Sequence, residues 1–159
     1  MAKRFAISSL VTVSLILGNL TLSSPSSAAP ITKAAAVKQL RKDVKPVVAA
    51  LAKFGVKVKK WNNSTPVAAV ASAMKPLGTA FQNFSFALLR VSWPRNARAD
   101  VRAVYFATSP IVADINSVAA LNGNDSTAIS AWVSGMEKDV AAWENAIVLV
   151  EHDLGLRVG

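Results

Sequence analysis

The sequence predicts an all-α protein, an antiparallel up-down-up-down four-helix bundle with proline-kinked helices. Three observations predict it. Apolar residues recur at alternating spacings of three and four over four long stretches, and each stretch is bounded by residues that start or stop helices. No stretch of comparable length alternates apolar and polar residues as a strand would. One apolar seam per helix, with mainly short connections, is typical of an up-down bundle.

The first 28 residues are predicted to be a cleavable secretory signal, and residues 29–159 a single helical domain. Lys3 and Arg4 supply the basic start of a signal, and the mostly apolar stretch 5–22 follows them. The protein is therefore expected to be secreted or associated with the cell envelope. The chain has no cysteine, so the domain has to hold together without a disulfide.

Signal cleavage is expected after Ala28, because a cut after Ala29 would leave Pro30 directly behind the scissile bond. The alternative is a retained membrane anchor. Hydroxyl side chains and Asn19 dilute the apolar stretch, and small residues typical of a cleavage site follow it at once. Cleavage is the favoured interpretation, and no later segment is apolar enough to span a membrane.

The first two helices are predicted from two apolar runs. The first run is Val37, Leu40, Val44, Val47, Leu51 and Phe54, and the second is Val67, Val70, Met74, Leu77, Phe81, Phe84, Leu88 and Val91. Gly55 is expected to end the first helix. Thr65 as N-cap and Pro66 at the first helical position are expected to begin the second.

The last two helices follow the same pattern. Their apolar runs are Ala97, Val101, Val104, Thr108, Ile111, Ile115 and Val118, then Ile129, Val133, Met136, Val140, Trp143, Ile147, Val150 and Leu154. Ser92 or Trp93 with Pro94 is expected to open the third helix. Asp125 or Ser126 is expected to cap the fourth, and Gly155 to end it.

Pro46, Pro76 and Pro110 fall inside the first three predicted helices. A proline removes one helical hydrogen bond and costs about 3 kcal/mol in a straight helix. We expect bends at these positions. The bends either let the helices wrap one core or, as the less favoured alternative, open a ligand cleft.

No catalytic or metal-binding set emerges, so the protein is predicted to be no enzyme and to need no cofactor. His152 is the only histidine, and it lies near a helix C-terminus, where the helix dipole alone favours it. Glu137, Glu144 and Glu151 repeat every seven residues, which separates successive carboxyls by about 10 Å. They are interpreted as an acidic flank that faces the basic first helix, namely Lys38, Arg41, Lys42 and Lys45.

Charge is the one functional indication. The net charge is +9, and fourteen lysines and arginines face two aspartates between residues 29 and 102, a balance of +12. From residue 103 onward the balance is −5, because seven acids face two basic residues. Two basic clusters could bind an anionic polymer of the envelope or lipid headgroups, and export disfavours nucleic acid as a partner. The candidate anion-binding residues are Lys57, Lys59, Lys60, Trp61, Arg95 and Arg98.

Three features of the sequence point to a resemblance with known proteins. They are the Ala/Val/Ser-rich composition, the signal, and Trp93-Pro94 followed by Ala97, Asp100 and Val101. The chain resembles small alanine-rich exported helical proteins of actinobacteria. That resemblance implies an exported helical domain and brings no activity with it. We therefore expect a binding or interaction module. A carrier or sensor of a small apolar ligand held between kinked helices is the alternative, and the sequence leaves the oligomeric state open.

Overall fold

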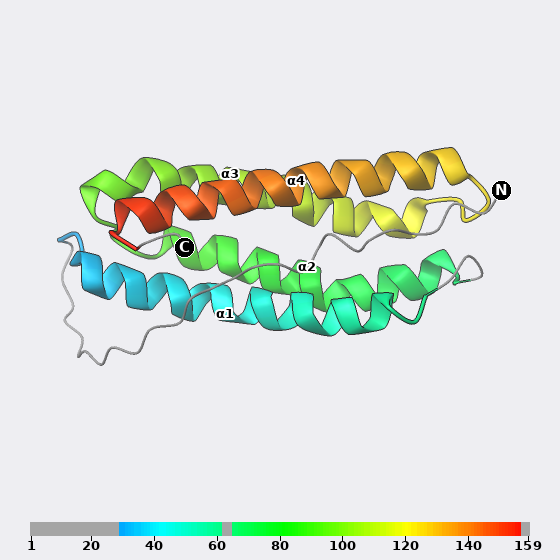
Figure 1. Ribbon diagram of the computed structural model, residues 1–159, viewed down its shortest axis with the longest axis horizontal. Helices are drawn as coiled ribbons and strands as arrows, with labels where there is room; N and C mark the ends of the chain where they lie inside the picture. Colours follow the sequence, from blue (N-terminus) through cyan, green and yellow to red (C-terminus); the bar gives the residue numbers. More distant parts are fainter. Residues whose placement is uncertain (1–28, 62–64, 157–159) are drawn as a thin grey trace.

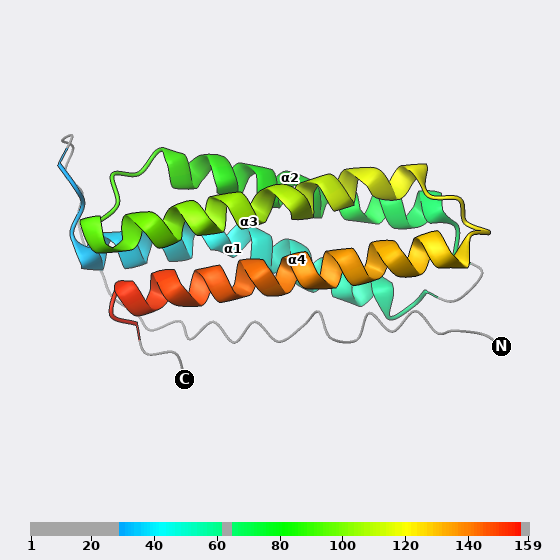
Figure 2. The ribbon, with the colours of Figure 1, turned by 90° about the horizontal axis from the view of Figure 1, so that it is seen from above.

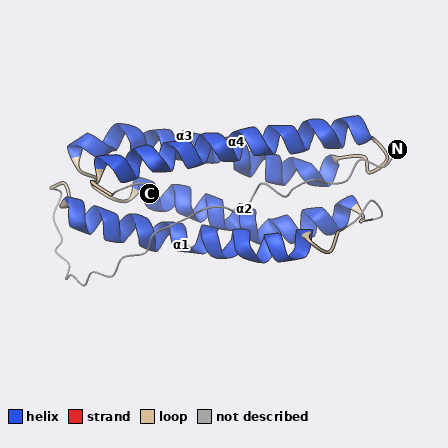
Figure 3. Ribbon diagram, in the orientation of Figure 1, coloured by secondary structure: helices blue, strands red, loops and turns tan. Residues whose placement is uncertain are grey.

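The computed structural model describes residues 29–61 and 65–156, and these ranges contain helices and no strand (Figure 3). The predicted signal at 1–28 lies outside the described residues. Four α-helices follow one another, with two short 3₁₀ helices beside the third. They are α1 (Lys33–Val58), α2 (Val67–Leu89), η1 (Arg95–Ala97), α3 (Arg98–Ser117), η2 (Val118–Ala120) and α4 (Ser126–Asp153). The predicted all-helical, four-helix class is confirmed.

The helices form two layers, with α3 and α4 lying over α1 and α2 (Figures 1 and 2). Neighbours in sequence pack together, α1 on α2, α2 on α3 and α3 on α4. The connections α1–α2 and α3–α4 lie at one end of the molecule, and the α2–α3 connection lies at the other (Figure 1). Two regions that the sequence marks as basic are therefore placed at opposite ends.

The core consists largely of the predicted apolar seams. Trp143 of α4 lies at its centre, with its ring edge-on to Phe81 at 5.3 Å and to Phe84 at 5.9 Å, centroid to centroid. Thr108 is the buried polar member, and its hydroxyl donates to the carbonyl of Val104 at 2.8 Å. The aromatic contacts of Trp143 join α2 and α4 through the middle of the bundle.

Two helix ends match the capping residues expected from the sequence. Asp125 caps α4, because its Oδ1 accepts from the backbone N–H groups of Thr127 at 3.0 Å and Ala128 at 2.9 Å. Gly155 ends α4 with a φ of +82°, a conformation that costs glycine little. Its N–H bonds the carbonyl of His152, and the next N–H bonds that of Glu151, which is a Schellman motif.

Two expected boundaries were wrong. Gly55 does not end α1, which continues to Val58, where the half-buried valine packs against the core. The apolar contact outweighs the helix-breaking tendency of one glycine, about 1 kcal/mol. Pro66 is the N-cap of α2 rather than its first helical residue, so the helix begins at Val67.

The three internal prolines lie within continuous helices. Pro46, Pro76 and Pro110 are inside α1, α2 and α3, and all three side chains are exposed. Each is followed by a buried residue, so the proline rings stand on the outer side of the helices and leave the core seam uninterrupted.

Candidate functional site

The six predicted anion-binding residues do not meet in one place. Lys57, Lys59 and Lys60 are exposed at the C-terminal end of α1. Arg95 and Arg98 are exposed at the start of α3, at the opposite end of the molecule. The sequence thus identified two separate basic clusters, and the second lies beside a hollow.

Trp61 belongs to the edge of the core. It is half-buried, and its ring lies edge-on to Phe54 with centroids 5.5 Å apart. Trp61 packs against the core and covers it just after the C-terminal end of α1. The indole of Trp61 therefore already contacts an aromatic ring of its own chain.

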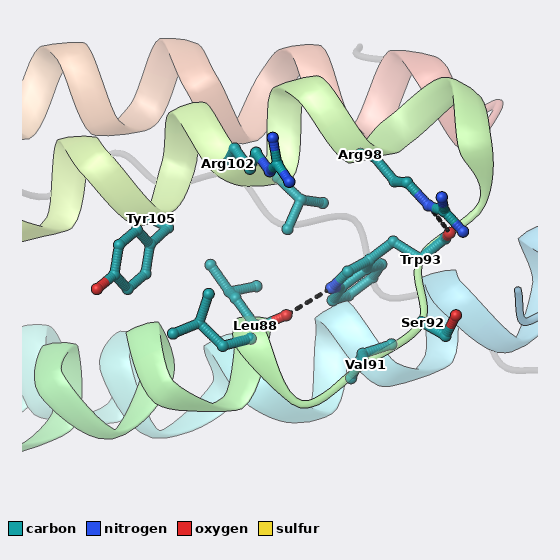
Figure 4. A pocket seen from close by; sticks show the side chains of 9 residues that line it. Leu88, Val91, Ser92, Trp93, Arg98, Arg102 and Tyr105 are labelled. Carbon is teal, nitrogen blue, oxygen red and sulfur yellow. Dashed lines mark hydrogen bonds between the residues drawn. The ribbon is translucent and has the colours of Figure 1, made fainter. Parts of the chain in front are cut away.

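A hollow of about 330 Å³ lies where α2 ends and α3 begins (Figure 4). We call it the corner groove. It is lined by Leu88, Leu89, Val91, Ser92, Trp93, Arg98, Val101, Arg102 and Tyr105. Arg98 is the one predicted site residue that lines it, and none of the three helix prolines does. The lining joins an apolar floor to two guanidinium groups.

The α2–α3 connection is held by hydrogen bonds on both sides of Trp93. The indole Nε1 donates to the carbonyl of Leu88 at 2.7 Å, and the side chain is only 4% exposed. Arg98 Nε donates to the carbonyl of Trp93 at 3.0 Å, so the arginine side chain folds back toward the α2–α3 connection (Figure 4). The N–H of Ile31 donates to the carbonyl of Ser92 at 2.8 Å. These bonds fix the wall of the groove before any ligand arrives.

Four arginines surround this corner. Arg90, Arg95, Arg98 and Arg102 are all exposed, and none of them forms an ion pair within residues 29–61 and 65–156. Arg102 lies one turn after Arg98 on α3, so both guanidinium groups share the side of the helix that borders the groove. The corner therefore presents four guanidinium groups that make no ion pair within the described residues.

Large apolar side chains are exposed next to the same groove. Leu89 is 60% exposed, Phe86 one turn before it is 48% exposed, and Phe106 is 67% exposed. The ring of Phe106 lies edge-on to that of Tyr105, with centroids 5.5 Å apart. Since Leu89 and Tyr105 both line the groove, an apolar surface continues from it along α2 and α3.

Two pairs of carboxyl groups cross the interface of α3 and α4, and the sequence reasoning missed them. Asp100 is paired with Asp153, and Asp114 with Asp139. Asp100 and Asp114 are fourteen residues apart on α3, and Asp139 and Asp153 are fourteen residues apart on α4. That equal spacing is the signal in the sequence that could have revealed the pairs. The two helices therefore place like charges opposite each other at two levels.

The pKa values of these carboxyls follow from their surroundings. Burial raises the pKa of Asp114, and the charge of Asp139 and a hydrogen bond between the two carboxyls raise it further. Burial, the charge of Asp153 and a hydrogen bond to it raise the pKa of Asp100, against a smaller opposing effect of His152. The Oδ2 atom of Asp114 is buried without a hydrogen-bond partner. In each pair, the protonated form of one carboxyl is thus stabilised relative to that of an ordinary aspartate.

The three glutamates of the acidic stripe on α4 differ in their exposure. Glu137 is exposed, whereas Glu144 and Glu151 are half-buried, and burial raises the pKa of both. The charge of Arg41 lowers the pKa of Glu151 in opposition, so that arginine of α1 lies near this glutamate. His152 is exposed, with Nδ1 3.7 Å from Oδ1 of Asp153.

The described residues hold no group of three or more histidine, aspartate and glutamate side chains placed to hold a metal ion. In the same part of the chain, no helix has both the length and the apolar character that crossing a bilayer requires. Comparison of the chain with known protein families, with curated proteins and with solved structures found no match. The corner groove and its surroundings therefore have to be interpreted from their own chemistry.

Proposed function

We propose that this protein is an exported, non-enzymatic binding module that contacts an anionic component of the cell envelope through the corner groove. One observation carries the proposal. Arg98 and Arg102 stand without ion-pair partners in the described chain, beside a preformed hollow with an apolar floor. Charge of this kind attracts an anion, and the hollow gives it a defined place to bind.

Location and architecture belong to the same proposal. The secretory signal at 1–28 and the resemblance to exported actinobacterial proteins support an envelope or extracellular location. The ends at which the connections lie in Figures 1 and 2 support an up-down-up-down bundle. The outward position of Pro46, Pro76 and Pro110 supports gentle bends around the core, because helices of globular proteins curve with their convex side toward solvent.

The basic cluster at the end of α1 is the alternative contact, and a matched pair of variants separates the two. Arg95→Gln with Arg102→Gln removes two charges at the corner without touching the hydrogen bond that Arg98 makes to the loop. Lys59→Gln with Lys60→Gln removes the same charge at the other end. Binding of the purified protein to poly(glycerol phosphate), and to vesicles containing phosphatidylglycerol, is measured at low and high salt.

We expect the corner variant to lose most of the salt-sensitive binding, because exposed charges interact over about 10 Å at 0.1 M salt and over only about 3 Å at 1 M. The lysine variant is expected to bind as the parent does. Equal losses in both variants would mean that net charge alone drives binding. No salt-sensitive binding to either anion would refute the proposed function.

A small-ligand carrier is a second candidate, which the apolar lining of the corner groove favours. Its volume of about 330 Å³ lies at the lower end of the range for ligand pockets. Native mass spectrometry of protein recovered from an expressing bacterium distinguishes this role, since a carrier retains a ligand mass. A bare protein mass would count against the carrier.

A further inference from the structure

We infer that the anionic partner of the corner groove is the surface of a lipid bilayer rich in acidic phospholipids. This inference rests on the proposed function and specifies its partner. It comes from the juxtaposition of unpaired arginines with protruding apolar side chains at one corner of the bundle. A hydrophilic polyanion would bind the arginines and would leave the protruding apolar side chains in contact with water.

The apolar part of this surface is a strip formed by Phe86, Leu89, Tyr105 and Phe106. Leu89 and Tyr105 meet at the groove, Phe86 extends the strip one turn along α2, and Phe106 extends it along α3. Three of the six large hydrophobic residues that are exposed in the described chain belong to it. Exposed apolar groups that gather next to cationic ones are typical of surfaces that dock into the headgroup region.

The charged part borders the strip at the α2–α3 connection. Arg90 follows Leu89 directly, and Arg98 and Arg102 stand on α3 before Tyr105. When the strip inserts between headgroups, these guanidinium groups come level with the phosphates. Stable attachment to a bilayer takes two weak signals acting together, and an apolar insertion with a basic patch is one such combination.

The described chain enters the domain at the same corner. The N–H of Ile31 donates to the carbonyl of Ser92, a residue of the groove wall, at 2.8 Å.

The test measures partition of the purified protein onto vesicles of equal parts phosphatidylglycerol and phosphatidylcholine, and onto vesicles of phosphatidylcholine alone. Arg95→Gln with Arg102→Gln is expected to weaken partition onto the acidic vesicles by roughly thirtyfold. Leu89→Ser with Phe106→Ser is expected to weaken it by roughly tenfold for each residue. Because both apolar side chains are mostly exposed, their removal leaves the core intact.

Two control variants match these changes at the other end of the molecule. Lys59→Gln with Lys60→Gln repeats the loss of charge, and Val56→Ser repeats the loss of an exposed apolar group, since Val56 is 59% exposed. Both are expected to partition as the parent does. Any contribution of the N-terminal segment is common to all variants and cancels in the comparison.

Insertion is tested directly with a tryptophan at the strip. In the Phe106→Trp variant, vesicles with brominated acyl chains should quench additional fluorescence relative to the parent. In the Val56→Trp variant they should quench no more than in the parent. Quenching of the Val56→Trp variant alone would overturn the inference.

The outcomes also separate this inference from the proposed function. If the arginine variant loses binding to soluble poly(glycerol phosphate) while the serine variant binds acidic vesicles undiminished, the anion site stands and the bilayer inference fails. If an acidic amphipathic peptide binds at the groove and vesicles do not, the partner is a protein and the inference also fails. If the arginine variant changes no binding at all, both proposals fail.

Discussion

Gly78 is a residue at which α2 packs closely against α3. A Cβ added there would lie 2.9 Å from Cγ2 of Ile115 and 3.8 Å from its Cβ. Ile115 is buried and β-branched, so its side chain strongly prefers one χ1 rotamer in a helix and moves aside only at a cost. The absence of a side chain at this position therefore lets the two helices approach.

Gly78→Ala is expected to lower the free energy of unfolding by about 1 kcal/mol, because overpacking of about 1–3 kcal/mol outweighs the usual helical gain of alanine. Gly135→Ala is the control. Its new Cβ meets only Oδ2 of Asp114, at 3.9 Å, and the helix should gain about 0.5–1 kcal/mol. Denaturant unfolding measures both changes. Equal stabilisation by the two alanines would contradict the close approach at Gly78.

At the scale of elements, the seam between α3 and α4 carries an unusual arrangement of charge. The Asp114–Asp139 and Asp100–Asp153 pairs set carboxyls against carboxyls, where a bundle usually sets opposite charges. Two ionised carboxylates so placed repel each other, whereas a shared proton joins them by a hydrogen bond. The seam is therefore less favourable at neutral pH than in mild acid.

Asp139→Asn is expected to raise the free energy of unfolding at neutral pH by about 1 kcal/mol, because the new amide can donate to the carboxylate of Asp114. The gain should shrink toward pH 4, because protonation of Asp114, whose pKa is raised, relieves the repulsion between the two carboxyls in the parent. Glu137→Gln is the control, since Glu137 is exposed on the same helix and carries the same charge. Unfolding curves at the two pH values test this. A similar gain in the control would assign the effect to net charge.

The helices could be predicted because buried residues recur along the sequence with the period of an α-helix. Residues such as Leu40, Phe81 and Val104 were assigned to the core by spacing alone, and all three are buried. Boundaries were less certain, since they depend on individual contacts. Val58 packs on the core and extends α1 past Gly55, and no local rule anticipates such a contact.

The corner groove was not predictable, for a physical reason. Its shape depends on how the α2–α3 connection folds, and the hydrogen bond from the Trp93 indole to the carbonyl of Leu88 helps to hold that connection. Arg98 was selected from the sequence because of its charge, whereas the roles of Leu89 and Tyr105 follow only from the approach of two helices. The carboxyl pairs likewise needed the relative register of α3 and α4.

At the scale of the whole molecule, every carboxyl whose pKa is displaced has it displaced upward. These groups are Asp100, Asp114, Glu144 and Glu151, and burial is the leading cause in each. The folded state therefore holds more protons than the unfolded chain between the unfolded and folded pKa values. The stabilising contribution is complete below the unfolded values, about 4, and is lost as the pH rises through the folded ones.

The melting temperature is consequently expected to fall as the pH rises from about 4.5 to 7. A variant with Asp114→Asn, Glu144→Gln and Glu151→Gln should show a flatter profile over the same range. Thermal unfolding followed by circular dichroism at several pH values measures both. A melting temperature that rises toward neutrality in the parent would contradict the upward displacement of these pKa values.

Both ends of the described chain are fastened beside the same corner. Ile31 bonds Ser92 at the beginning, and the side-chain amide of Asn96 donates to the carbonyl of Asp153 at 2.6 Å near the end. A bulky group attached close to Ile31 or to Asp153 would therefore stand beside the groove. The exposed turn at Asn124, between α3 and α4, lies at the far end (Figure 2). A dye or biotin attached there would leave the corner free and would present every molecule in one orientation.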